Sequence, residues 1–145
     1  MTHCRDPKQC AKKAFNRERR LFDRLSFAEE LLHEFRMNLL EGQGVLLESF
    51  HSERRQVDRL YSKRDIRSAI EEGWAIDYSE FEGRIEITVM SYIRVSLGVY
   101  RPIHVVCGIT NPKLWVIITV KDPSERPWRW DEKYEKKICF CNIEV

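Results

Sequence analysis

The hydrophobic pattern of this chain changes once, from helical spacing in the first part to strict alternation in the second. Apolar residues three or four positions apart predict two helices within the first forty residues. Asp6 before Pro7 predicts the start of the first helix, and Ser26, three residues before Glu29, predicts the start of the second. The stripes expected to face the core are Phe15, Phe22 and Leu25, then Phe27, Leu31, Phe35 and Leu39.

Beyond Gly44, a short apolar run at residues 45–47 predicts a strand. Ser62 with Asp65 has the form of a capping box, which predicts a further helix that ends at Gly73. From Trp74 onward polar and apolar residues alternate, and the run from 85 to 97 gives the clearest strand pattern. We therefore expect an α+β domain, with N-terminal helices packed on one face of a four- or five-stranded antiparallel sheet.

Two more strands are expected on either side of Asn111-Pro112. Alternation in the first turns Cys107 toward the core and His104 the other way, and alternation in the second turns Val116 inward and Trp115 outward. The side chains expected to share the open face of the sheet are Tyr92, Arg94, His104, Trp115 and Lys121. Alternatively, the N-terminal helices cover Trp115 and Ile117.

Composition indicates one globular domain, since 43% of the 145 residues are apolar and 33% are charged. We expect residues 1–44 to form a basic helical arm, and residues 45–145 to form the core with a cysteine-containing tail. No apolar run is long enough to span a membrane, and the first ten residues lack the apolar segment of a secretory signal. The expected location is the cytoplasm.

Charge is concentrated in residues 5–24, which hold eight basic residues against three acidic ones. This concentration suits binding to a polyanion, and it is also compatible with a plain solvated helix face.

His51, Arg55 and Arg59 recur every fourth residue, which places them along one stripe of a helix. Guanidinium groups bind phosphate oxygens bidentately, and histidine exchanges protons near neutral pH, so this stripe suits a phosphate backbone. Neutralisation by Glu53 and Asp58 is the competing interpretation.

Five cysteines, an odd number, favour free thiols. Cys107 lies in a strand pattern and is expected in the core, which disfavours a third alternative, a hydrolase with a cysteine nucleophile. We expect no cofactor. The alternative is a zinc ion held where the termini meet, although the Cys-x-Cys spacing is unusual for such sites; its ligands would be Cys4, Cys10, Cys139 and Cys141, with His3 beside them.

The order HSERRQVDR, SKRDIRSAIEEG, RPIHVVCG and VIITVKDP, followed by Trp128, resembles a bacterial domain family related to BrnT and RelE-like toxins of toxin-antitoxin systems. The resemblance covers about residues 45–130. It implies helices on an antiparallel sheet and a metal-independent endoribonuclease that acts on RNA. It also implies a cognate antitoxin as a partner, and a homodimer is a further alternative. The arm of residues 6–41 and the tail depart from the family pattern.

Under that reading the ribose 2′-hydroxyl attacks the adjacent phosphate. Proton transfer falls to His51, His104 or Tyr92, and charge stabilisation to Arg55, Arg59 and Lys121. Arg94 and Trp115 would help to bind the RNA, Trp115 by stacking on a base. The rival hypothesis is a non-catalytic module that binds nucleic acid or protein. An enzyme needs its two histidines together in an open pocket, whereas a binding module needs only a continuous basic surface.

Overall fold

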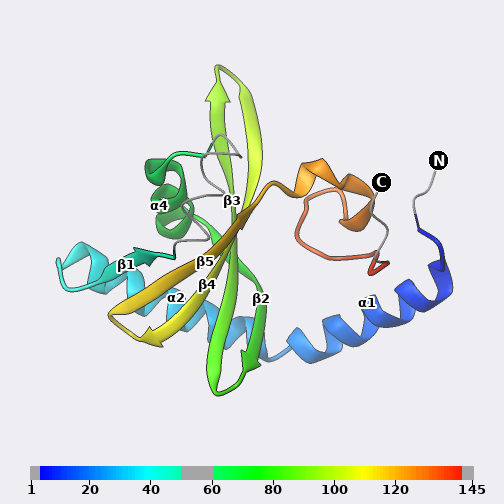
Figure 1. Ribbon diagram of the computed structural model, residues 1–145, viewed down its shortest axis with the longest axis horizontal. Helices are drawn as coiled ribbons and strands as arrows, with labels where there is room; N and C mark the ends of the chain where they lie inside the picture. Colours follow the sequence, from blue (N-terminus) through cyan, green and yellow to red (C-terminus); the bar gives the residue numbers. More distant parts are fainter. Residues whose placement is uncertain (1–3, 50–60, 142–145) are drawn as a thin grey trace.

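The computed structural model describes residues 4–49 and 61–141 (Figure 1). Within these ranges the helices are α1 (Pro7–Leu21), α2 (Arg24–Leu40) and α4 (Lys63–Glu72). The strands are β1 (Val45–Glu48), β2 (Trp74–Phe81), β3 (Arg84–Ser96), β4 (Val99–Asn111) and β5 (Leu114–Lys121), followed by the short 3-10 helices η1 (Pro123–Glu125) and η2 (Pro127–Arg129).

The five strands form one sheet in the order β1-β5-β4-β3-β2. Strands β2 to β5 pair antiparallel, as expected, while the edge strand β1 pairs parallel with β5. The predicted α+β fold with helices packed on the sheet is therefore confirmed, and the sheet is mixed. None of the helices described has the length and apolar character needed to cross a bilayer.

Two of the three predicted helix starts are confirmed by their caps. The Asp6 carboxylate accepts from the Gln9 N–H at 3.1 Å, and Ser62 and Asp65 exchange reciprocal hydrogen bonds of 3.0 Å. The predicted start at Ser26 is wrong, because α2 already begins at Arg24. Phe22 and Asp23 between the two helices both keep right-handed helical dihedral angles, so the extended residue that a capping box requires is missing there.

The main core lies between the sheet and helices α2 and α4. Helix α2 turns one stripe inward, consisting of Ala28, Leu32, Phe35 and Leu39, and α4 adds Ile66, Ala69 and Ile70. Phe35 and Leu39 are buried and Leu25 and Leu31 pack against the core, as predicted, but Phe15, Phe22 and Phe27 are exposed. Phe15 and Phe22 are exposed because α1 extends past the sheet and buries a different face, built on Cys10, Arg17 and Leu21 (Figure 1).

Trp115 lies in this core, and its predicted place on the open face is wrong. The indole is fully buried and stacks on Phe35 with ring centroids 4.7 Å apart. A β-bulge explains the difference: Cys107 pairs with Ile117 and Val106 with Thr119, so Ile118 is one residue too many. The extra residue reverses the alternation within β5, so Trp115 and Ile117 lie in the core, and of the N-terminal helices α2 covers Trp115 through Phe35.

The opposite face of the sheet carries the C-terminal segment, residues 122–141, drawn in orange to red in Figure 1. The Tyr92 hydroxyl donates to the Lys133 carbonyl at 2.9 Å, and His104 contacts Trp130 and Tyr134. This segment, together with α1, covers a face that the sequence predicts to be open.

Candidate functional site

His104 lines a cavity of about 320 Å³ between the sheet and the C-terminal segment. Only 1% of this residue is exposed, so its predicted position on an open face is wrong. Cross-strand pairing places Lys121 directly beside it. His51, Arg55 and Arg59, the predicted stripe, lie outside the described residues.

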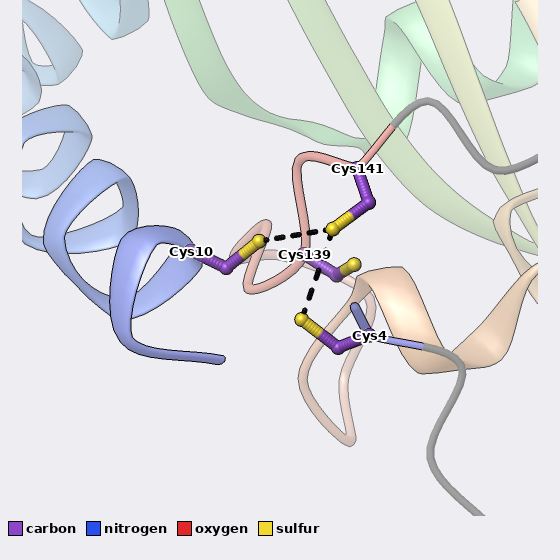
Figure 2. A group of neighbouring side chains, drawn as sticks. All are labelled: Cys4, Cys10, Cys139 and Cys141. Atoms are coloured by element: carbon purple, nitrogen blue, oxygen red, sulfur yellow. Dashed lines mark hydrogen bonds between the residues drawn. The ribbon is translucent and has the colours of Figure 1, made fainter. Parts of the chain in front are cut away.

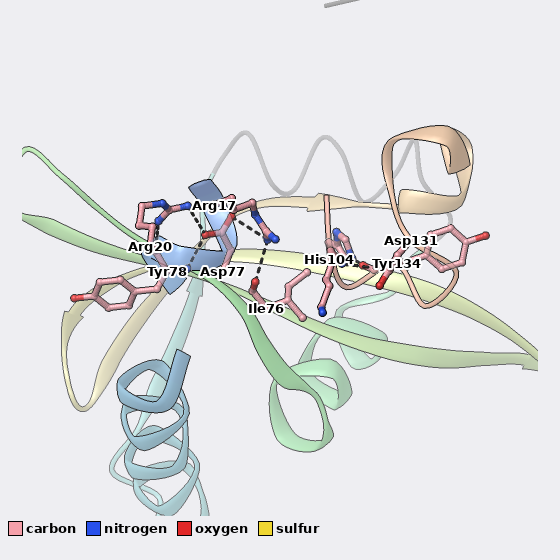
Figure 3. Close-up of polar contacts among 9 residues, drawn as sticks. Arg17, Arg20, Ile76, Asp77, Tyr78, His104, Asp131 and Tyr134 are labelled. Carbon is pink, nitrogen blue, oxygen red and sulfur yellow. Dashed lines mark hydrogen bonds and ion pairs between the residues drawn. The ribbon is translucent and has the colours of Figure 1, made fainter. Parts of the chain in front are cut away.

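Two contacts hold the His104 ring. Its Nε2 lies 2.7 Å from the Tyr134 carbonyl oxygen, and because a carbonyl can only accept, Nε2 carries the proton (Figure 3). Trp130 meets the ring edge-on, with centroids 4.5 Å apart. Burial lowers the pKa of His104 to about 4, with further lowering by the charges of Lys121 and Arg17. The ring is therefore neutral at physiological pH.

A tight turn in the C-terminal segment aims the Tyr134 carbonyl at this ring. Trp130 pairs with Lys137 across the turn, and the Asp131 carboxylate accepts from the Glu135 and Lys136 N–H groups at 2.9 and 3.2 Å. Tyr134 itself adopts a φ of 61°, which is uncommon for a residue with a side chain. The turn therefore directs the Tyr134 carbonyl oxygen toward His104 Nε2.

Cations outnumber carboxylates in the cavity wall. Lys121, Arg126, Arg129 and Lys137 line it together with Asp122 and Glu125. Asp122 also faces Arg101, at 3.7 Å, and accepts from Ser124. Burial lowers the pKa of Lys137, and repulsion from Arg129, Lys121 and Arg17 lowers it further. These positive charges are close enough to repel one another, so an anion in the cavity would be stabilised.

A second cavity of about 420 Å³ adjoins the first and shares Lys137 with it. Its other basic residues come from one face of α1: Lys13, Arg17 and Arg20. Arg17 is buried, donates to the Ile76 carbonyl at 3.0 Å and faces Asp77, and Arg20 also faces Asp77 (Figure 3). Part of the predicted basic arm is therefore used to attach α1 to β2.

We call the two cavities together the basic groove, defined by Lys13, Lys121, Arg126, Arg129 and Lys137. Of the other predicted residues, Tyr92 is 40% exposed and holds Lys133 in the C-terminal segment. Arg94 lies farther along β3, opposite Tyr100, and is exposed; neither cavity includes it in its lining.

Four cysteines meet where α1 approaches the end of the C-terminal segment (Figure 2). The Sγ atoms of Cys4, Cys10, Cys139 and Cys141 all lie within 4.8 Å of one another. Burial raises the pKa of the Cys4 thiol to about 12, while a hydrogen bond from the Arg5 backbone lowers that of Cys141 to about 7. We call this group the four-cysteine cluster. Cys107 is separate, fully buried in the main core as predicted.

Comparisons with family models, with curated proteins and with solved structures returned no match for this chain. The resemblance to the toxin-related family remains a prediction from short motifs.

Sequence reasoning missed the residues that the C-terminal segment brings to the cavity, above all Arg126, Arg129 and Lys137. Three aromatic residues within seven positions, Trp128, Trp130 and Tyr134, were the available indication that this segment packs on something. The segment has neither helical nor strand periodicity, so the pattern could not say on what.

Proposed function

We propose that this protein binds RNA without cleaving it, with the basic groove holding the phosphate backbone. The observation that carries the proposal is the gathering of Lys121, Arg126, Arg129 and Lys137 around one cavity, against two carboxylates among the described residues that line it. Lysine and arginine contacts to phosphate supply most of the sequence-independent affinity for nucleic acid. Lys13 on α1 extends the positive charge into the adjoining cavity.

An aromatic ring in the wall supports single-stranded RNA over other polyanions. Trp130 is half-buried and lines the cavity beside the cations. Cationic grooves with interspersed aromatic rings bind single strands, because bases stack on the rings while phosphates meet the cations. We propose the cytoplasm as the location, since thiols such as those of the four-cysteine cluster stay reduced there.

Binding is tested by the fluorescence anisotropy of a labelled single-stranded RNA over a range of salt concentrations. Lys121→Gln and Arg126→Gln should each weaken binding about 3- to 10-fold and reduce the salt slope by about 0.7. Lys113→Gln is the matched control: Lys113 is exposed just before β5, whereas Lys121 ends that strand. The proposal fails if the wild-type protein does not bind at low salt, or if all three folded variants bind equally.

A toxin-type endoribonuclease is the second candidate, and one observation favours it. His104 and Lys121 are cross-strand partners that line the same cavity, so a neutral base adjoins a cation. The 2′-oxygen would form a bond to phosphorus as the bond to the 5′-oxygen breaks, while a base takes the 2′ proton and an acid gives a proton to the leaving 5′-oxygen. Burial of His104 and the engagement of its Nε2 argue against this role.

Expression in a bacterium separates the two candidates. Growth arrest with cleaved total RNA that His104→Gln abolishes, while the variant stays folded, would favour the ribonuclease. Intact RNA from well-expressed protein that still binds RNA in the anisotropy assay would support binding alone.

A further inference from the structure

We propose that the four-cysteine cluster binds one zinc ion and thereby fastens α1 to the C-terminal segment. This inference does not rest on the proposed RNA binding, because none of the four cysteines belongs to the residues that define the basic groove, although Arg129 and Lys137 lie near both.

The spacing of the sulfur atoms fits tetrahedral coordination. A zinc–sulfur bond is about 2.3 Å, which places tetrahedral sulfurs about 3.8 Å apart. The observed separations are 3.5 Å between Cys10 and Cys141 and 3.9 Å between Cys4 and Cys141, and all pairs fall within 4.8 Å. One ion at the centre would reach all four sulfurs after small adjustments. Tetrahedral sites with four thiolates are typical of structural zinc.

Local structure explains how the unusual spacing works. Cys139 and Cys141 are two residues apart in a segment without helical structure, and alternate side chains of an extended chain point to one side. Cys10 lies in the first turn of α1, where the helix dipole favours negative charge, and Cys4 comes just before the cap. The Phe140 N–H points at the Cys10 sulfur at 3.3 Å, the kind of hydrogen bond that supports a metal-bound thiolate.

Nearby cations suit the charge of such a centre. Zinc with four thiolates carries a net charge of about −2. Arg5 is adjacent to Cys4 in the chain, Arg129 donates to the Cys141 carbonyl at 2.9 Å, and Lys137 lies two residues before Cys139. Four protein ligands leave no open position, so this zinc would be structural rather than catalytic.

Metal content provides the first test, with the fifth cysteine as control. Protein purified under reducing conditions with added zinc should contain about one zinc ion per chain by elemental analysis. Cys139→Ser and Cys10→Ser should lose most of it, while Cys107→Ala should keep it, because Cys107 lies in the core away from the cluster. Equal zinc in the cluster variants and in the wild-type protein would overturn the proposal.

Cobalt gives a second measurement that does not depend on the folding of a variant. Cobalt added to the metal-free wild-type protein should produce the visible spectrum of a tetrahedral tetrathiolate site, and zinc should then displace it. A six-coordinate cobalt spectrum would overturn the proposal. So would intact masses showing that the purified protein holds these cysteines as disulfides, or iron in place of zinc in the purified protein.

Discussion

The Tyr134 carbonyl oxygen lies 2.7 Å from His104 Nε2, so a backbone group of the C-terminal segment is bonded to a buried ring of the sheet. Both the neutral and the protonated ring can donate from Nε2 to this carbonyl, and the hydrogen bond alone favours the protonated form. Burial lowers the pKa of the His104 ring most, and the charges of Lys121 on β5 and Arg17 on α1 lower it further, whereas Asp122 before η1 opposes them.

Acid should therefore destabilise this protein through His104. Its pKa is about 4 in the folded chain against an ordinary 6.5, so below pH 6.5 the unfolded state takes up a proton that the folded state does not. The free energy of unfolding is then highest above that pH and falls as pH decreases toward 4. Between about pH 7.5 and pH 5 the loss from this group is about 2 kcal/mol.

Urea unfolding of the wild-type protein and of His104→Gln at several pH values measures this loss. Glutamine keeps an N–H donor for the Tyr134 carbonyl but does not titrate. The variant should show a pH dependence that is smaller by about 2 kcal/mol over the same range. Parallel curves for the two proteins would show that His104 is not the group responsible.

Trp115 should matter for stability and not for binding. Its ring is fully buried against Phe35, so Trp115→Ala should cost about 3–5 kcal/mol. Trp74→Ala is the control, because Trp74 is only half-buried beside Tyr92, and its loss should cost less. Trp115→Phe should fold and bind RNA as the wild type does. A clear loss of RNA affinity in that variant would instead support the predicted stacking of Trp115 on an RNA base.

Two serines with the same sequence signature should behave differently. Ser62 caps α4 in a reciprocal hydrogen-bond pair, so Ser62→Ala should cost about 1 kcal/mol. Ser26 lies inside α2, and Ser26→Ala should change stability by no more than about 0.5 kcal/mol. Thermal or urea unfolding of the two variants decides this, and equal losses would contradict the helix start at Arg24.

Arg17 should contribute more to stability than its exposed neighbour on the same helix. It is buried, donates to the Ile76 carbonyl and faces Asp77, so Arg17→Ala should cost about 2–3 kcal/mol. Arg19 is exposed over Phe15, and Arg19→Ala should change stability by less than about 0.5 kcal/mol. Similar unfolding midpoints for both variants would mean that α1 is not attached to β2 through Arg17.

The sequence predicts the position of a residue correctly where that position depends only on its near neighbours in the chain. The caps at Asp6 and Ser62 and the burial of Cys107 follow from neighbours within a few positions, and they were predicted correctly. Trp115 was misplaced because one extra residue in β5 shifts the alternation, and a bulge leaves no mark in the pattern of apolar residues. The burial of His104 depends on a segment about thirty residues away that has no periodicity at all.

The bulge at Ile118 also has a consequence for how β5 can vary. Trp115 and Lys121 are six positions apart, so regular alternation would place them on one face, yet the indole lies in the core and the lysine beside His104. Losing a single codon at position 118 would restore that alternation. Either the ammonium group would then enter the apolar core or the indole would leave it. Strand β5 can therefore accept exchanges of side chain far more readily than a change in its length.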